Sequence, residues 1–263
     1  MLDRHTIARL MSEYEFPWDI TRALELALFR TYAVPSIGAL LYRTGKFVDR
    51  AQLRYDDTTL LLAEIWRDGA DSPRGRSAVA RLNQIHGRYR ISNDDFRYTL
   101  ATFVVQPIRW LREFGWRPPS PAEVTAWTEA MRAMGDGMGI TELPADFQQF
   151  SAYLDDYERR RFRYRPANAA VAAATIELMA SWFPRLVRPL VRRGATALLD
   201  EPLLDALGLA HPPVALRRLA RSSLRLRALL IRLGPPRPDG RPSVLRSRSY
   251  PAGYSLAALG TER

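Results

Sequence analysis

The stretch Arg81–Phe96, RLNQIHGRYRISNDDF, contains the end of one helical pattern, a turn, and the start of the next. Val79, Leu82 and Ile85 recur at three-residue steps, the spacing of side chains on one face of an α-helix. Ser92–Asp95 has the S-x-x-D pattern of a helix N-cap, so a second helix is predicted to begin there. This stretch therefore indicates a fold built by packing helix against helix.

Helical periodicity, interrupted by proline, glycine and capping residues, continues along almost the whole chain, and no alternating strand pattern of any length occurs. The predicted fold class is all-α: a single large helical domain with basic C-terminal helices. We assign residues 1–183 to a helical core and residues 184–263 to a basic helical extension packed on it. The predicted helices are 21–32, 36–41, 56–66, one that begins at Ser72-Pro73 and contains His86, 92–114 with a kink at Pro107, one that begins at Ser120 and ends in the glycines of 135–139, 144–161, 167–182, 186–199 and 214–233.

The chain has 263 residues, of which 47% are hydrophobic, and this is enough to bury a sizeable core. It contains no cysteine, which excludes disulfides, zinc fingers, iron–sulfur sites and thiolate chemistry. The net charge is +11, and nearly all the excess is C-terminal, because residues 181–263 hold 15 arginines against 5 acidic residues. Such a region can bind anionic lipid or nucleic acid. Alternatively, the many arginines can result from the codon usage of a GC-rich genome, since Lys46 is the only lysine.

The N-terminal stretch MLDRHTIARLMSEYEF carries acidic residues and no apolar core of a signal peptide. No run of about 18 uncharged apolar residues occurs, so no spanning helix is predicted. The expected location is cytoplasmic, with a peripheral membrane contact through the basic C-terminal region as a further expectation.

His86, one of three histidines, falls on the apolar side of the predicted helix, one turn after Leu82. A lone histidine there is either a hydrogen-bonded core residue or an axial ligand, because many haem irons are held by one imidazole in an apolar pocket. His5 and His211 are expected to face solvent.

Arg54 and Thr58 are four residues apart at a predicted helix start, so their side chains can face the same space. They are either a helix cap with a surface arginine or part of a site. Four arginines near His86 could pair with carboxylates, including haem propionates, or could be solvated: Arg76, Arg81, Arg88 and Arg90.

Three other patterns are explained without chemistry. Asp94 and Asp95 are accounted for by helix capping, and the cluster of Met131, Met134 and Met138 by core filling. The glycines at 135, 137 and 139 follow a helix rather than opening one after a strand, so they do not indicate nucleotide binding.

The order of short motifs along nearly the whole chain resembles the fungal MpaB-type oxygenase family of the mycophenolic acid pathway. The motifs are Tyr32-Ala-Val-Pro-Ser36, Thr44-Gly45-x-Phe47, Arg54-Tyr-Asp-Asp-Thr58, Asn83-Gln-Ile-His86, Ile91-Ser-Asn-Asp-Asp-Phe96 with Tyr98-Thr99, Phe114-Gly-Trp-Arg117, Met138-Gly-Ile140, Leu143-Pro144, Tyr157-Glu158 and Tyr250-Pro-x-Gly-Tyr254. That family shares its catalytic domain with the bacterial latex clearing proteins, which are all-helical rubber oxygenases. Those enzymes bind b-type haem through one histidine and cleave isoprenoid double bonds with dioxygen.

The resemblance implies that His86 is the proximal haem ligand and binds the iron, and that Arg54 and Thr58 line the haem pocket as catalytic and cofactor-binding residues. Two positions depart from the pattern. Rubber oxygenases carry a lysine just before the threonine as a distal ligand, where this chain has Asp57. They also carry an upstream glutamate as a proposed base, whereas no glutamate lies between Glu25 and Arg54 here.

The sequence therefore leads to the hypothesis of a haem b-dependent oxygenase that uses dioxygen on a hydrophobic, isoprenoid or prenylated substrate, with oxidative cleavage of a C=C bond as the reaction. One alternative is a haem or metal oxidoreductase that desaturates or couples a small natural product. The other is a non-enzymatic basic helical protein that binds lipid, and no nucleic-acid partner is expected.

Overall fold

The computed structural model describes residues 2–234 and 247–261, and within these ranges the secondary structure is helical, with no strand. The all-α prediction is confirmed. In chain order the elements are α1 (Arg4–Arg9), the π-helix η1 (Leu10–Glu15), α2 (Pro17–Tyr32), α3 (Pro35–Arg43), α4 (Lys46–Asp49), α5 (Ala51–Asp68), α6 (Pro73–His86), α7 (Asn93–Phe114), α8 (Pro121–Gly137), α9 (Phe147–Arg161), α10 (Pro166–Ser181), the 3₁₀ turn η2 (Arg185–Val187), α11 (Arg188–Ala197), α12 (Glu201–Leu207), α13 (Val214–Leu233) and the 3₁₀ turn η3 (Leu256–Ala258).

Helix α7 forms the centre of the core and packs against α2, α8 and α9. Its N-terminus is held by Ser92, whose Oγ accepts a hydrogen bond from the backbone N–H of Asp95 at 3.1 Å. Pro107 lies inside the helix, which continues to Phe114. Because most of its residues from Tyr98 onward are buried, α7 is the element on which the other core helices are assembled.

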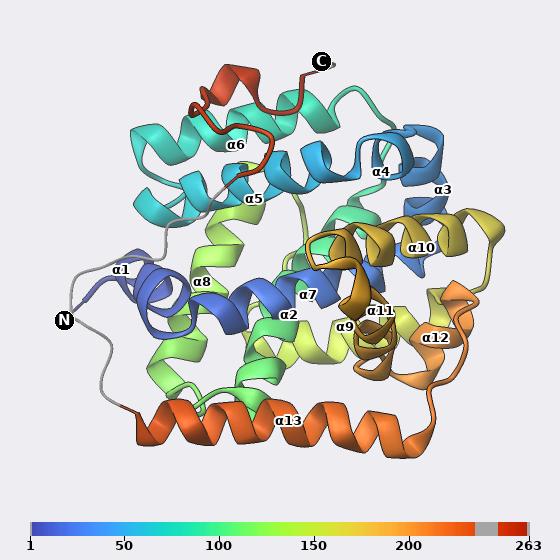
Figure 1. Cartoon of the computed structure of the whole chain (residues 1–263). Helices are drawn as coiled ribbons and strands as arrows, with labels where there is room; N and C mark the ends of the chain where they lie inside the picture. Colours follow the sequence, from blue (N-terminus) through green and yellow to red (C-terminus); the bar gives the residue numbers. More distant parts are fainter. Residues whose placement is uncertain (1, 235–246, 262–263) are drawn as a thin grey trace.

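Helices α5 and α6 pack against each other and form a layer at the opposite edge of the molecule from α13 (Figure 1). The short segment before and after η3, drawn in red in Figure 1, returns to this layer and lies against α6. Arg81 fixes the contact, because its Nε and Nη2 donate to the carbonyl of Leu259 at 2.9 and 2.7 Å. The C-terminal residues thus cover the helix that carries His86.

Helix α13 runs along one edge of the molecule (Figure 1) and is fixed to the core by ion pairs. Arg227 Nη1 lies 3.0 Å from Asp19 Oδ1 on α2, and Arg225 Nη2 lies 3.0 Å from Glu113 Oε1 on α7. Arg221 also pairs with Glu113. The described part of the basic C-terminal region therefore contacts the helices of the core directly.

Several predicted boundaries are wrong. Helix α5 begins at Ala51 rather than at Asp56, because the two aspartates at 56 and 57 are buried acceptors within the helix rather than N-terminal residues. Helix α9 begins at Phe147, since Asp146 rather than Pro144 caps it by accepting from the N–H of Gln149. The predicted helix 186–199 is a 3₁₀ turn followed by α11, and α1, η1, α4 and α12 were not predicted.

Among the described helices, none taken singly is long and apolar enough to cross a membrane. Only α2 and α3 taken together meet the limits of length and composition, across a bend of 99°.

Candidate functional site

A cavity of about 1160 Å³ lies between α2, α5, α6, α7 and α10, with residues of the C-terminal segment 253–261 on one side. Its wall is largely apolar and includes Leu24, Leu28, Ile37, Leu41, Leu82, Ile85, Phe96, Phe103 and Met134. Ligand pockets commonly measure roughly 300–1,000 Å³, so this cavity can hold a large apolar ligand. Arg54, Thr58 and His86 all line it, so the structure brings the three predicted site residues together in one cavity.

His86 is the last residue of α6, and the sequence of this helix explains its position. Ser72 caps the helix by accepting from the N–H of Gly75 at 2.9 Å, and Leu82 and Ile85 are buried on the inner face. The imidazole ring meets the ring of Phe96 edge-on, with centroids 5.3 Å apart. His86 is therefore held at the cavity wall by helix packing and an aromatic contact.

One ring nitrogen of His86 lacks a hydrogen-bond partner within the part of the chain that the structure describes. This nitrogen is Nδ1, which is buried. Burial, followed by the nearby positive charge of Arg54, lowers the pKa of His86 to about 4. The ring is consequently neutral at pH 7, which is the state in which histidine binds a metal.

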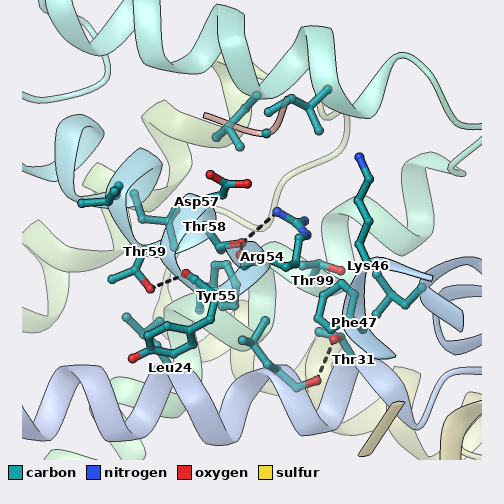
Figure 2. Close-up of a pocket in the computed structure, with 18 of the residues that line it drawn as sticks. Leu24, Thr31, Lys46, Phe47, Arg54, Tyr55, Asp57, Thr58, Thr59 and Thr99 are labelled. Atoms are coloured by element: carbon teal, nitrogen blue, oxygen red, sulfur yellow. Dashed lines mark hydrogen bonds between the residues drawn. The ribbon is translucent and has the colours of Figure 1, made fainter. Parts of the chain in front are cut away.

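Arg54 and Thr58 lie one turn apart on α5 and hydrogen-bond to each other. Arg54 Nη1 donates to Thr58 Oγ1 at 2.9 Å, and that hydroxyl donates to the backbone carbonyl of Arg54 at 2.9 Å. Figure 2 shows the pair beside Phe47 and Thr99. The guanidinium carbon lies 5.5 Å from the centroid of the Phe47 ring, a cation–π contact. The threonine thus fixes the orientation of the arginine.

The charge of Arg54 is enclosed without a direct counter-charge. Burial lowers its pKa from the usual value, and the more distant charge of Asp57 acts in the opposite direction. Within the described ranges Arg54 forms no salt bridge, and its polar side-chain contact is with Thr58. A part-buried guanidinium without a counter-charge at a cavity wall favours an anion or a polarised oxygen atom in that cavity.

Residues 19–232 match the protein family described as ER-bound oxygenase mpaB/B'/Rubber oxygenase, catalytic domain. The chain belongs to this family. The resemblance seen in the order of motifs is confirmed, and the match includes all of the elements that carry Arg54, Thr58 and His86.

Three fungal members of the mpaB/rubber oxygenase family can be aligned with this chain. ER-bound oxygenase mpaB' of Penicillium brevicompactum is 30% identical over 251 residues, which is 88% of this chain and 59% of that protein. ER-bound oxygenase mpaB of Penicillium roqueforti (strain FM164) is 29% identical over 219 residues, 76% of this chain and 74% of the relative. ER-bound oxygenase mpaB of Penicillium brevicompactum is 32% identical over 193 residues, 66% and 49% respectively. The chain thus spans between half and three quarters of the length of these relatives.

Asp57, which departs from the rubber oxygenase pattern, has a structural partner within this mpaB-family fold. Its Oδ1 accepts a hydrogen bond from the Tyr250 hydroxyl at 2.6 Å, and the adjacent Asp56 accepts from the backbone N–H of Ser249 at 2.7 Å. Both acceptors are buried. These two carboxylates therefore hold the C-terminal segment on α5.

Tyr254 belongs to the same segment and lines the cavity. Its hydroxyl donates to Oε1 of Glu64 at 2.6 Å, and Glu64, which is fully buried, is also paired with Arg74. Burial and the charge of Glu64 raise the pKa of Tyr254 to about 12. The neutral phenol thus acts as a fixed donor that closes one side of the cavity.

Glu25 on α2 is a cavity residue that the sequence did not identify as part of the site. Its Oε1 accepts from Arg22 Nη2 at 2.6 Å and from the Tyr55 hydroxyl at 2.7 Å, whereas its Oε2 is buried without a partner. Burial raises the pKa of this carboxyl group. The available signal was an acidic residue within the buried run of α2, between the leucines at 24 and 26.

The other sequence candidates lie in structural contacts. His5 and His211 each lie beside one aspartate, Asp71 at 3.3 Å and Asp205 at 2.7 Å, and neither lines the cavity. No group of three histidine, cysteine or acidic residues within ranges 2–234 and 247–261 could hold a metal ion.

Asp94 and Asp95 do not form a carboxylate pair. Asp94 pairs with Arg97 at 2.6 Å, whereas Asp95 accepts hydrogen bonds from the hydroxyls of Ser36 and Tyr157, both at 2.9 Å. The Ser92 cap accounts for the start of the helix, as predicted, but the Asp95 carboxylate also joins α3, α7 and α9. Its burial thus follows from tertiary contacts that capping alone does not explain.

Proposed function

We propose that this chain is a haem b-dependent oxygenase that uses dioxygen to cleave a C=C bond of a hydrophobic, isoprenoid or prenylated substrate. The observation that carries the proposal is a neutral imidazole and a part-buried guanidinium without a counter-charge on the wall of one large apolar cavity, in a chain of the mpaB/rubber oxygenase family. Cleavage converts one C=C bond into two C=O groups, and both oxygen atoms come from dioxygen.

The residues present fit a haem. The chain has no cysteine, and among the histidines His86 is the one at the cavity, where its buried Nδ1 leaves Nε2 as the nitrogen available to iron. The lack of any three-residue metal cluster in the described ranges agrees with a metal that arrives with its own macrocycle. Of the four arginines near His86, Arg90 lines the cavity and is the candidate partner for a propionate. When bound, haem b supplies the redox chemistry with dioxygen that side chains do not provide.

Arg54 and Thr58 supply fixed donors within the cavity. Their mutual hydrogen bond and the contact with Phe47 orient the guanidinium before any substrate enters. Preorganised donors in an enclosed site stabilise negative charge that develops on oxygen during a reaction. We propose that Arg54 stabilises that charge. Thr58 positions Arg54 and also forms part of the cavity wall.

The apolar wall supports a hydrophobic substrate, and its volume exceeds what a small polar metabolite requires. A peripheral membrane contact belongs to the same proposal, because isoprenoid and prenylated compounds partition into bilayers. The ER-bound description of the fungal relatives is compatible with such a contact.

The first test is the absorption spectrum of protein expressed with a haem precursor, with a pyridine haemochrome assay to quantify and type the haem. The wild type and the control His211→Ala are expected to show a Soret band, and His86→Ala is expected to lack it. Normal haem content in His86→Ala would refute the ligand assignment. A well-folded wild type that takes up no haem would refute the cofactor and favour a non-enzymatic lipid-binding protein.

The reaction is tested by incubating haem-loaded protein with squalene or geranylgeraniol under ¹⁸O-labelled dioxygen and reducing the products at once to prevent exchange with water. Cleavage predicts one labelled oxygen atom in each of two shorter products. Products of unchanged chain length without label would instead identify a desaturating or coupling oxidoreductase.

A further inference from the structure

Helix α13 exposes the side chains that a helix on a soluble protein normally buries. Its exposed leucines lie at spacings of three, four and seven residues and therefore share one face. We call this set the leucine face: Leu219 (63% exposed), Leu226 (56%), Leu229 (49%), Leu230 (61%) and Leu233 (75%). By contrast, Ala228 is the one buried residue of the helix.

The arginines of α13 are divided between the two sides of the helix. Arg217, Arg221 and Arg227 are turned toward the protein and pair with Glu201, Glu113 and Asp19. Arg218 and Arg232 are exposed near the two ends of the leucine face, and neither forms a salt bridge within the described ranges. The helix contains no acidic residue. The helix therefore differs from an ordinary surface helix, because it exposes several leucines and turns three of its six arginines toward the protein.

We propose that the leucine face of α13 docks on the surface of an anionic lipid bilayer, with the helix lying in the plane of the membrane interface. Leucines in the acyl boundary and arginines at the level of lipid phosphates are the arrangement by which interfacial helices bind. This inference rests on the proposed function, because an enzyme with a hydrophobic substrate needs access to the membrane in which that substrate dissolves.

A second copy of this chain is a weaker match to the same face. Two α13 helices packed through their leucine faces would bring Arg218, Arg225 and Arg232, spaced by seven residues, next to the same arginines of the other copy in an antiparallel pair. No acidic residue on either helix could offset the repulsion. An anionic surface supplies the missing negative charge.

Helix α13 does not have the composition of a spanning segment. It has 20 residues, but six are arginines, and no single described helix passes the test for a membrane span. A location in the interface is therefore the membrane contact that its composition permits.

The test is co-flotation of the full-length protein with vesicles of phosphatidylcholine containing 30% phosphatidylserine, compared with vesicles of phosphatidylcholine alone. Wild type is expected to float with the anionic vesicles and to dissociate from them as salt is raised. The variant Leu226→Ser/Leu230→Ser is expected to bind about 30-fold more weakly, since each half-exposed leucine loses part of its transfer free energy. The matched control is Leu2→Ser/Tyr42→Ser, which removes apolar groups of 59% and 49% exposure outside α13 and is expected to bind as wild type does.

A second pair of variants tests the contribution of charge. Arg218→Gln/Arg232→Gln is expected to reduce binding to the anionic vesicles by roughly 30-fold, because each arginine near an anionic surface strengthens binding by roughly five- to six-fold. Arg159→Gln/Arg160→Gln, which removes two exposed charges from the end of α9, is the matched control and is expected to have little effect.

Three results would overturn the inference. The first is that the leucine variant floats with the vesicles as wild type does. The second is that wild type is a dimer and the leucine variant a monomer. The third is preferential, salt-sensitive binding to a DNA duplex that the leucine substitutions do not alter. Failure here is distinguishable from failure of the proposed function, because haem content is measured on the same samples. If haem-loaded protein does not bind vesicles, only the proposed docking surface is contradicted. If haem-free protein binds vesicles, only the proposed cofactor is contradicted.

Discussion

The guanidinium of Arg54 on α5 and the imidazole of His86 at the end of α6 line the same cavity, and the charge of the first lowers the pKa of the second. Burial is the larger cause, and together the two effects bring the pKa of His86 to about 4. This relationship connects two residues that belong to separate motifs in the sequence. The pKa of His86 and its effect on stability can therefore be measured without knowing the substrate.

The first prediction concerns stability in acid. Between pH 6.5, the ordinary pKa of histidine, and about 4, the unfolded chain binds a proton at His86 that the folded protein does not. The free energy of unfolding should therefore fall as the pH falls through this window, by at most about 3 kcal/mol. Urea unfolding of protein purified without added haem, at pH 7, 5.5 and 4.5, measures this loss. His86→Gln should lack it and His211→Gln should retain it, so parallel pH curves for wild type and His86→Gln would contradict the prediction.

The second prediction isolates the contribution of Arg54. Replacing Arg54 with Met removes the positive charge that disfavours the imidazolium, so the pKa of His86 should rise while remaining below the ordinary value because burial persists. Titration of the imidazole Cε1–H signal by nuclear magnetic resonance measures the shift. Arg76→Met is the control, since Arg76 lies on the same helix as His86 but donates to the backbone carbonyl of Asp71. An equal shift in both variants would mean that the overall charge of the protein, rather than the nearby charge of Arg54, sets the pKa of His86.

Local signals in the sequence were sufficient for most of the fold. The caps at Ser72, Ser92 and Ser120 mark helix starts through short-range hydrogen bonds, and these predictions are confirmed. The range predicted for α13 is likewise confirmed. By contrast, the start of α5 was wrong because Asp56 and Asp57 act as acceptors for residues 193 positions away in the chain.

The candidate site could be predicted only in part. The i, i+4 spacing of Arg54 and Thr58 and the apolar stripe ending at His86 are visible in the sequence, so the three residues could be named. Their common cavity depends on the packing of α5 against α6, which no local pattern specifies. Glu25 and Tyr254 could not be added, since one comes from α2 and the other from the C-terminal segment, and tertiary contacts alone bring them to this cavity.

The third prediction concerns the segment that closes the cavity. Tyr254→Phe removes the donor to the buried Glu64, which keeps its pairing with Arg74. The free energy of unfolding should fall by about 1–2 kcal/mol, and amide hydrogens of 247–261 should exchange faster than they do in wild type, whereas those of α7 should not change. Urea unfolding and hydrogen exchange with mass spectrometry measure the two effects. Tyr42→Phe, at an exposed position on α3, should change neither, and unaltered exchange of 247–261 in Tyr254→Phe would show that the hydrogen bond does not hold the segment.

The fourth prediction tests whether the basic C-terminal region and the core unfold as one unit. Asp19 is almost fully buried and accepts hydrogen bonds from Trp110 Nε1 and Arg227 Nη1, both at 3.0 Å. Arg227→Met should therefore leave a buried carboxylate without its counter-charge and lower the free energy of unfolding by about 3 kcal/mol, because uncompensated buried charge is strongly destabilising. Thermal unfolding should remain a single transition at a lower Tm. Asp19→Asn in the same chain should recover much of the loss, and Arg232→Met, at an exposed position, should cost little. Two separate transitions in Arg227→Met, with the core transition unmoved, would mean instead that α13 is only loosely coupled to the helices that form the cavity.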